Sequence, residues 1–185
     1  RGKTAVVIGG GMGRTKETQE AINEYLKQVR VPVVIDADAI YAVNKNPEII
    51  GGKNFLFTPH TYEFFILTGK QVYNLPDEEK IKIVQEEAQR LGTTILLKGA
   101  VDIISNGKEA ALNKTGTPYM SKGGTGDTLA GIAGALMARG LEPFLAGQAA
   151  AFINGLAGEL ASKKLGESMT SADLIEEIPN ILPKF

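Results

Sequence analysis

The sequence has no cysteine and only one histidine, and its apolar stretches are short. Without cysteine the chain can form no disulfide, no zinc–thiolate site and no cysteine nucleophile. No apolar run approaches the roughly 18 residues typical of a membrane-spanning helix. The first four residues, Arg-Gly-Lys-Thr, hold no apolar signal-peptide core. We therefore expect a soluble cytoplasmic protein that does not bind a membrane.

The chain also lacks an excess of either charge. Lysine and arginine together number 20 and the acidic residues 21, which gives a net charge of −1. Such a balance provides no basic surface for a nucleic acid and no polybasic patch for anionic lipids. The 185 residues, 43% of them hydrophobic, suffice for one globular domain with its own core, and we predict a single domain over residues 1–185.

Short β-branched runs alternate with amphipathic stretches along the chain. The pattern predicts strands at residues 5–8, 32–35, 54–58 and 93–97, and helices at residues 16–29, 77–91, 128–139 and 144–163. It also predicts two short helices, one that ends at residue 68 and one that spans residues 172–178. Two further strands, 101–105 and 109–113, flank Asn106-Gly107, which is a strong type I′ hairpin signal. We therefore predict an α/β fold with a mainly parallel sheet, helices on both faces and one β-hairpin.

Side chains at the expected helix ends predict where several helices begin and stop. Asp77 and Ser171 are of the residue types that cap helix N-termini. Gly92 is suited to a C-cap, because glycine adopts the left-handed conformation there. Pro179 should stop the last helix, since proline cannot donate the next backbone hydrogen bond.

The segment at residues 121–127, Ser-Lys-Gly-Gly-Thr-Gly-Asp, precedes a strongly apolar helical pattern. Three glycines within residues 123–126 let backbone N–H groups point inward at the positive end of a helix, which suits an anion such as phosphate. Asp127 stands at the entrance of that helix. As an N-cap it would only satisfy backbone N–H groups. Beside an anion site it could take the proton of a hydroxyl that attacks a phosphoryl group.

Two glycines inside the same helical pattern, Gly131 and Gly134, carry a separate prediction. Glycine costs a helix roughly 1 kcal/mol relative to alanine. We therefore expect another stretch of backbone to pack closely against this helix.

Four more loops follow predicted strands, at residues 9–13, 36–39, 59–63 and 98–102. Because the carboxyl ends of parallel strands share one edge of the sheet, these loops and the glycine-rich segment should line one crevice. A glycine loop followed by Asp36 also suggests a dinucleotide-binding fingerprint, but the pattern requires glycine where Arg14 stands. A tight turn without a ligand is a further interpretation of that loop, and a lone loop histidine such as His60 need have no role.

The segment at residues 123–127 resembles the anion hole and catalytic aspartate of the ribokinase-like superfamily. Taken with four other stretches, the chain resembles the NAD(P)H-hydrate dehydratase family of nicotinamide repair lyases. The stretches are Gly-x-Gly-Met-Gly-Arg at 9–14, Asp-Ala-Asp-Ala at 36–39, Thr-Pro-His-x-x-Glu-Phe at 58–64, Leu-Lys-Gly-Ala at 97–100 and Gly-Gly-Thr-Gly-Asp at 123–127. The family usually has proline at the position of Gly10, and its domains carry further N-terminal elements. We therefore expect this chain to be the C-terminal portion of a ribokinase-like domain.

The resemblance implies a reaction. The substrate would be the (6S) hydrate of NADH or NADPH, whose C6 hydroxyl is phosphorylated by a nucleotide before phosphate leaves and NAD(P)H is regenerated. Prokaryotic members generally use ADP and eukaryotic members ATP, and we expect ADP here. Magnesium is expected with the nucleotide phosphates. The small residues of the last two long helices would allow a homo-oligomer.

The resemblance also assigns roles to residues. Asp127 is the expected catalytic base and a substrate contact. The remaining assignments are nucleotide binding by Lys98, Gly99, Ala100, Val101, Asp102, Gly124, Thr125 and Gly126, substrate binding by Gly13 and His60, and an outer-sphere magnesium contact by Glu63. Two other functions stay open: a ribokinase-like kinase of a small alcohol, such as a thiazole or pyrimidine vitamin precursor, and a nucleotide-binding module without catalysis.

Overall fold

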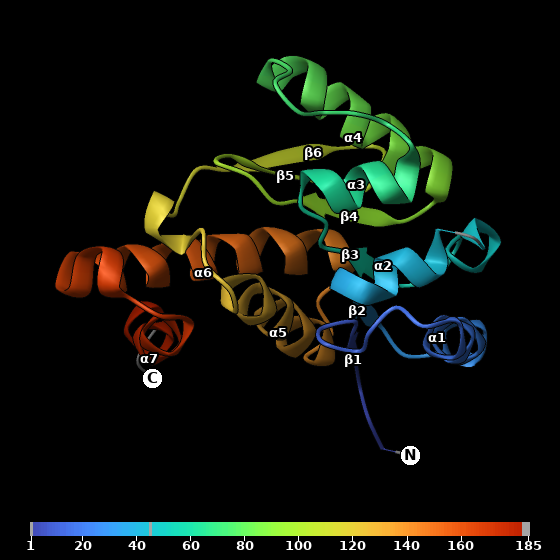
Figure 1. The fold of residues 1–185 in the computed structure, drawn as a ribbon, viewed down its shortest axis with the longest axis horizontal. Coiled ribbons are helices and arrows are strands. Elements are labelled where there is room, and N and C mark those ends of the chain that lie inside the picture. Colours follow the sequence, from blue (N-terminus) through green and yellow to red (C-terminus); the bar gives the residue numbers. More distant parts are fainter. Residues whose placement is uncertain (1, 45, 183–185) are drawn as a thin grey trace.

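A computed structural model describes residues 2–44 and 46–182; the predicted domain limits, residues 1 and 185, lie outside these ranges. The fold is built on a six-stranded sheet whose strands lie in chain order, β1 (Val6–Ile8), β2 (Val33–Ile35), β3 (Phe55–Phe57), β4 (Thr94–Leu97), β5 (Asp102–Ser105) and β6 (Ala110–Asn113). The first four strands are parallel, and β4, β5 and β6 pair antiparallel. This confirms a mainly parallel sheet with one hairpin (Figure 1).

Helices cover both faces of the sheet (Figure 1). One face packs against α1 (Lys16–Gln28), α2 (Ala37–Val43), α3 (Thr61–Thr68) and α4 (Asp77–Leu91). The other packs against α5 (Thr125–Ala138) and α6 (Pro143–Leu165), and α7 (Ser171–Ile181) packs on α6. Among the described residues, no helix is long and apolar enough to span a membrane.

The strands are apolar on both sides, as expected for a parallel sheet covered by helices. Val33 and Ile35 belong to the core under α1 to α4, whereas Val34 between them belongs to the core under α5 and α6. Residues 55–57 and 95–97 alternate in the same way. The sheet is therefore held between two separate apolar layers, and its polar groups concentrate at the strand ends.

Several helix starts differ from those predicted. The helix expected from residue 128 begins at Thr125 with Gly124 as N-cap, so Asp127 lies inside its first turn and is not the N-cap. Pro76, not Asp77, precedes α4, and Thr170, not Ser171, caps α7. Helices α5 and α7 thus begin three residues and one residue earlier than predicted, whereas α4 begins at Asp77 as predicted and only its N-cap differs. The caps were misplaced because capping side chains are also common in the first turn itself. Gly92 is the C-cap that we predicted, with φ of 61°.

Two other local predictions were wrong. Pro179 lies inside α7, where the loss of its own N–H is tolerated so near the helix end, and Leu182 still donates to Ile178 O at 3.4 Å. The hairpin is not type I′, because Gly107 has a positive φ but Asn106 does not. Asn106 instead accepts hydrogen bonds from the N–H groups of Lys108 and Glu109 at 2.9 Å each, which closes a longer turn.

The two interior glycines of α5 have different surroundings. A side chain at Gly134 would overlap Val7 of β1, so this glycine permits close packing, although against a side chain and not the backbone that we predicted. Gly131 has open space around it. Helix α2 was not predicted at all, because its seven residues are too few for a clear helical period.

Candidate functional site

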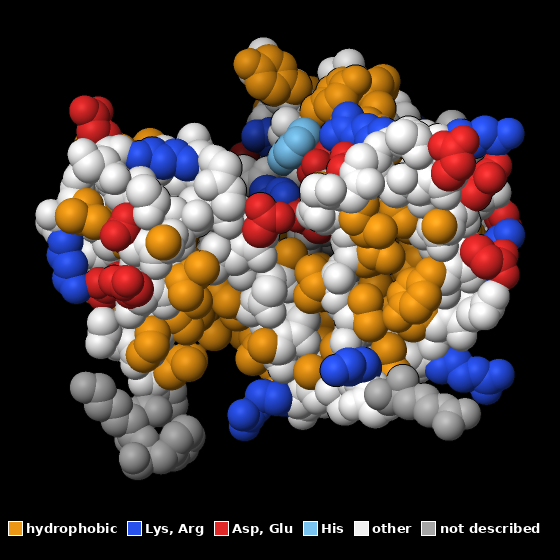
Figure 2. Space-filling view, turned by 60° about the horizontal axis from the view of Figure 1, so that its bottom comes forward, with side chains coloured by type: hydrophobic (Ala, Val, Ile, Leu, Met, Phe, Trp, Pro, Cys, Tyr) orange, Lys and Arg blue, Asp and Glu red, His pale blue; other side chains and the backbone are white. Residues whose placement is uncertain are grey.

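At the carboxyl edge of the sheet, the loops after β3 and β4 and the glycine-rich segment border a cavity of about 790 Å³. The loops at residues 9–13 and 36–39 contribute no residue to its lining, so the prediction that all four loops line one crevice was only partly right. Its lining comes from the ends of β3 and β4, the segment at residues 115–126, and the facing sides of α5 and α6. Figure 2 shows a hollow in the surface with histidine, basic and acidic side chains gathered around it. A cavity of this size suits a nucleotide-sized ligand.

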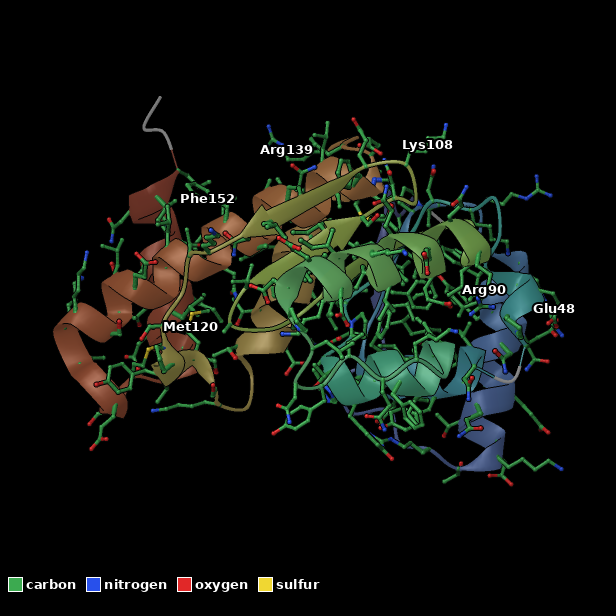
Figure 3. All side chains as sticks on the ribbon, turned by 90° about the horizontal axis from the view of Figure 1, so that it is seen from above. Glu48, Arg90, Lys108, Met120, Arg139 and Phe152 are labelled. Carbon is green, nitrogen blue, oxygen red and sulfur yellow. The ribbon has the colours of Figure 1, made fainter. Side chains whose placement is uncertain are left out.

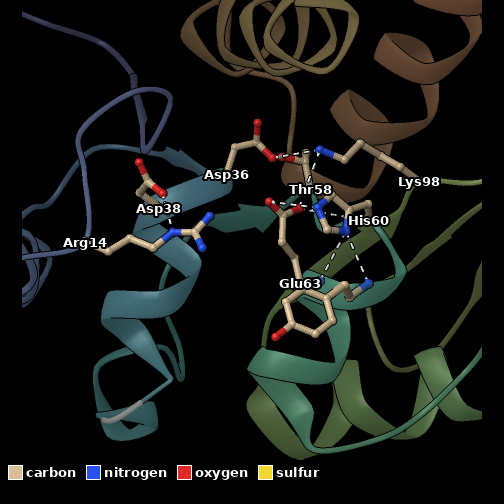
Figure 4. Close-up of polar contacts among 8 residues, drawn as sticks. Arg14, Asp36, Asp38, Thr58, His60, Glu63 and Lys98 are labelled. Atoms are coloured by element: carbon tan, nitrogen blue, oxygen red, sulfur yellow. Dashed lines mark hydrogen bonds and ion pairs between the residues drawn. The ribbon is translucent and has the colours of Figure 1, made fainter. Parts of the chain in front are cut away.

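A buried charged network lies at the ends of β2, β3 and β4 (Figure 4). Asp36 is 4% exposed, and its Oδ1 accepts hydrogen bonds from Thr58 Oγ1 at 2.8 Å and from Lys98 Nζ at 2.9 Å. Lys98 Nζ also lies 3.9 Å from Glu63 Oε2. Two carboxylates thus hold one ammonium group, and this placement keeps it beside the first turn of α5, where a Cβ on Gly126 would lie 3.4 Å from Nζ.

The turn between β2 and α2 is strained. Ala37 has φ of 44°, a conformation that residues other than glycine rarely adopt. On either side of it, Asp36 faces Thr58 and Lys98, whereas Asp38 faces the loop at residues 9–13. The strained residue therefore separates two carboxylates with different partners, and such strain is common at functional sites.

His60 begins α3 and takes part in a capping box. Its Nδ1 accepts hydrogen bonds from Tyr62 N at 3.2 Å and Glu63 N at 3.3 Å, while Glu63 Oε2 accepts from His60 N at 2.9 Å. Because Nδ1 is an acceptor, the proton of the neutral ring sits on Nε2, which lies 3.4 Å from Glu63 Oε1. The histidine lines the cavity, so it combines a structural bond with an exposed imidazole.

The glycine-rich segment forms a cradle at the start of α5. Gly124 has φ of 93° and provides no side-chain cap, which leaves the first-turn N–H groups of α5 without an N-cap partner. Asp127 is exposed in this first turn. Its Oδ1 points toward the glycine loop, where a Cβ on Gly10 would lie only 2.7 Å away. Orphan amides and a carboxylate therefore stand side by side.

The loop at residues 9–13 is anchored to α2 by a clasp that the sequence did not reveal. Asp38 accepts hydrogen bonds from Gly13 N at 2.8 Å and Arg14 Nε at 2.6 Å, and the Arg14 guanidinium lies 3.6 Å above the ring of Tyr41. The Arg14 side chain holds the pKa of Asp38 below its usual value. The amide of Gly13 is therefore directed at Asp38 in this structure.

The loop after β4 is held by Asp102. Gly99 N donates to its Oδ1 at 3.0 Å, and Asn113 Nδ2 donates to its Oδ2 at 3.0 Å. Burial raises the pKa of Asp102 in spite of these bonds. Lys98 N also donates to Pro59 O at 2.8 Å, which ties this loop to the start of α3. These bonds therefore anchor the loop in the cavity wall.

Most of the residues named from the sequence come together around this cavity. Its lining includes His60, Lys98, Gly99, Ala100, Asp102, Thr125 and Gly126, whereas Gly13, Glu63, Val101, Gly124 and Asp127 are outside the lining. Glu63 is adjacent through His60 and Lys98, and Asp127 through the cradle. Sequence reasoning gave no site role to Asp36, Thr58 or Asp38, although polar side chains directly after buried strands were a usable signal.

Comparison with known proteins identifies relatives along almost the whole chain. The profile of the NAD(P)H-hydrate dehydratase family matches residues 2–180. The bifunctional NAD(P)H-hydrate repair enzyme of Hyperthermus butylicus is 46% identical over 183 residues, which cover 96% of this chain and 34% of that enzyme. The ADP-dependent (S)-NAD(P)H-hydrate dehydratase of Nitrosopumilus maritimus is 41% identical over 181 residues, which cover 95% of this chain and 61% of the relative. The chain thus spans less than two thirds of either protein.

A solved structure shows the same arrangement of elements. The ADP/ATP-dependent NAD(P)H-hydrate dehydratase from Bacillus subtilis, co-crystallised with ATP/Mg²⁺, gives a TM-score of 0.80 at 28% identity and covers 96% of this chain and 63% of that one. This likeness confirms the predicted ribokinase-like α/β fold, and the profile match confirms the resemblance in sequence. The chain belongs to the NAD(P)H-hydrate dehydratase family.

Proposed function

We propose that the protein containing this chain dehydrates the (6S) hydrate of NADH or NADPH, with ADP as phosphoryl donor. The observation that carries the proposal is the position of Asp127, directly behind the glycine cradle and facing the glycine loop at Gly10. Family membership and the ADP-dependent relatives support the choice of substrate and donor.

In the first step Asp127 takes the proton of the C6 hydroxyl. The hydroxyl oxygen forms a bond to the terminal phosphorus of ADP, and the bond from that phosphorus to its bridging oxygen breaks, so that AMP leaves. The N–H groups of Thr125 and Gly126 and the ammonium of Lys98 stabilise the negative charge on the transferred group. Asp36 and Thr58 support this by holding Lys98 in place.

In the second step the bond between C6 and oxygen breaks and phosphate leaves with the electron pair. A proton is lost from C5, so the double bond between C5 and C6 forms again and the dihydronicotinamide is restored. Phosphate is a far better leaving group than hydroxide, which explains why a dehydration should consume a nucleotide. The loop at residues 9–13 and His60 would hold the nicotinamide side of the substrate.

A magnesium ion would enter with the nucleotide. No group of three or more histidine, cysteine or acidic side chains within the described residues could hold a metal on its own. This fits Mg²⁺, which is usually held by substrate phosphates and water with one or two carboxylates. Glu63 is the carboxylate that would reach it through water. When bound, the ion would neutralise phosphate charge during transfer.

The remaining assignments follow from this placement. We infer that residues 98–102 and Gly124, Thr125 and Gly126 bind the adenine nucleotide, and that Gly13 contacts the hydrate after its amide is released from Asp38. A single domain, a homo-oligomer and a cytoplasmic location stay predictions.

Product analysis of the full-length protein tests the proposal. With the hydrate and ADP we expect inorganic phosphate, AMP and recovery of the absorbance of the reduced nicotinamide, in equal amounts. A stable phosphate ester formed from a thiazole or pyrimidine alcohol, without turnover of the hydrate, would identify a vitamin-precursor kinase instead. Nucleotide binding without any turnover would leave only a binding module, and either result would refute the proposed reaction.

A further inference from the structure

Asn154 carries an unsatisfied polar atom beside the cavity. Within residues 2–44 and 46–182, the buried side-chain atoms without a hydrogen-bond partner are Oδ1 of Asn23 and Oδ1 of Asn154. Asn154 is 6% exposed, lies in the middle of α6 and lines the cavity. Asn23 does not line it. Because a buried acceptor without a donor is costly, its presence at a binding cavity points to a ligand.

The orientation of the Asn154 amide follows from its one hydrogen bond. Nδ2 donates to Thr125 O at 3.4 Å, so the amide cannot be reversed without placing two oxygens against each other. Oδ1 therefore faces away from Thr125. Because Asn154 lines the cavity, a donor on a ligand bound there is the partner that Oδ1 lacks.

The cavity lining combines charged and apolar residues. Lys98 lies beside Gly126 of the cradle, and the apolar residues of the lining include Leu129, Ala151, Pro118 and Met120. Met120 lies beside α6 (Figure 3), and a side chain at Gly158 would overlap its sulfur. A nucleotide with its phosphates in the cradle would lay its flat, largely apolar base against these apolar residues, and Asn154 lines the same cavity.

We propose that Asn154 Oδ1 accepts a hydrogen bond from the exocyclic amino group of an adenine base, which makes Asn154 a determinant of nucleotide specificity. The proposal rests on the nucleotide binding in the proposed function. Hypoxanthine has an oxygen in place of that amino group, so it would set two acceptors against each other. A site built to hydrogen-bond one group rejects analogues that lack it.

Calorimetric titration of the full-length protein with ADP, IDP and 2′-deoxy-ADP tests this, without need of turnover. We expect the parent to bind ADP at least about tenfold more tightly than IDP. Asn154→Ala should bind ADP about tenfold more weakly than the parent and lose the preference over IDP. Asn23→Ala removes another buried asparagine, one that does not line the cavity, and it should keep the parent affinities. The parent's ratio of ADP to IDP affinity tests the proposal even if a variant fails to fold.

Equal binding of ADP and IDP by the parent would overturn the proposal, as would an unchanged preference in Asn154→Ala. If Asn154→Ala instead abolishes the difference between ADP and 2′-deoxy-ADP, the partner is a ribose hydroxyl and the proposal is wrong. In each of these results ADP still binds, so the proposed function survives. A parent protein that binds no ADP would refute both the proposed function and the role of Asn154.

Discussion

The imidazole of His60 caps α3 and also lines the cavity. Substitution can separate these two roles. His60→Ala removes the N-cap of α3 and should lower the free energy of unfolding by about 1 kcal/mol. His60→Asn keeps a good N-cap, so it should be close to the parent in stability. Both variants lose the imidazole, and both should raise KM for the hydrate more than they weaken ADP binding.

Thermal melts and steady-state kinetics on the two variants give the answer. A histidine that only caps the helix would predict a normal KM in His60→Asn, and that result would remove His60 from the substrate site. Sequence alone did not reveal the cap, since histidine is uncommon as an N-cap residue.

Because of Asp38, the free energy of unfolding should fall at acid pH. Arg14 lowers the pKa of this carboxyl in the folded state. The stability that it contributes is therefore fully present above its ordinary pKa of about 4 and is lost as the pH falls through the lowered value. Urea unfolding of the parent and Asp38→Asn should show a difference in stability at pH 6 to 7 that shrinks at about pH 3. A difference that stays constant across this range would refute the ion pair as its cause.

At the scale of single residues, the sequence predicted the side chains that lie in recognisable motifs. Asp127, His60 and Lys98 were named because each follows a strand or a glycine segment. The partnership of Asp36, Thr58 and Lys98 could not be named, because it joins three strands whose lateral order the sequence does not state. The unsatisfied oxygen of Asn154 was equally invisible, since it depends on the packing of α6 on α5.

The first turn of α5 forms part of the proposed phosphate site, and two glycines of this helix, Gly126 and Gly131, can be compared by substitution. Gly126 lies in the cradle, and an added methyl would sit 3.4 Å from Lys98 Nζ, whereas Gly131 has open space around it. Alanine at either position should favour the helix by up to about 1 kcal/mol. Gly126→Ala should also weaken ADP binding about tenfold or more by filling the phosphate site, whereas Gly131→Ala should leave it unchanged.

Calorimetry on both folded variants provides the comparison. Equal ADP affinity in Gly126→Ala and Gly131→Ala would mean that the nucleotide phosphates do not lie in the cradle.

At the scale of elements, the types of the long helices and of the strands were predictable, and their ends were less so. The 3.6-residue period and the β-branched runs located the strands and the long helices, because these signals extend over many residues. The start of α5 was misplaced by three residues, since Thr125, Gly126 and Asp127 carry no apolar period. The turn of the hairpin was misjudged because Asn106 uses its side chain, not a positive φ, to close it.

At the scale of the whole molecule, the alternation of strands and helices predicted a sheet covered on both faces. The lateral order of the strands was not predicted, and in the structure neighbours in the chain are also neighbours in the sheet. The meeting of loops at one edge of the sheet was also predictable, because parallel strands end together, although only the loops after β3 and β4 line the cavity. What the sequence could not provide was the depth of the cavity and the clasp between Arg14 and Asp38, both of which depend on side chains from distant segments.

Asp127→Asn in the full-length protein tests whether Asp127 is the base of a phosphoryl transfer. Asparagine keeps the size but cannot accept the proton, so kcat should fall by about 10²- to 10⁴-fold. Asp127 makes no cap bond, so stability should change by less than about 1 kcal/mol, through the helix dipole alone. Asp77→Asn, also in the first turn of a helix but away from the cavity, is the control and should keep full turnover.

The measurement is the turnover of the hydrate with ADP in Asp127→Asn, taken together with its melting temperature and its ADP affinity. We expect a folded variant that binds ADP at least as tightly as the parent, because a negative charge near the phosphates is gone, and that turns over at most about a hundredth as fast. A general base is worth far more than a threefold change in rate. Turnover within about threefold of the parent would therefore show that Asp127 is not the base and is only an acidic residue in the first turn of α5.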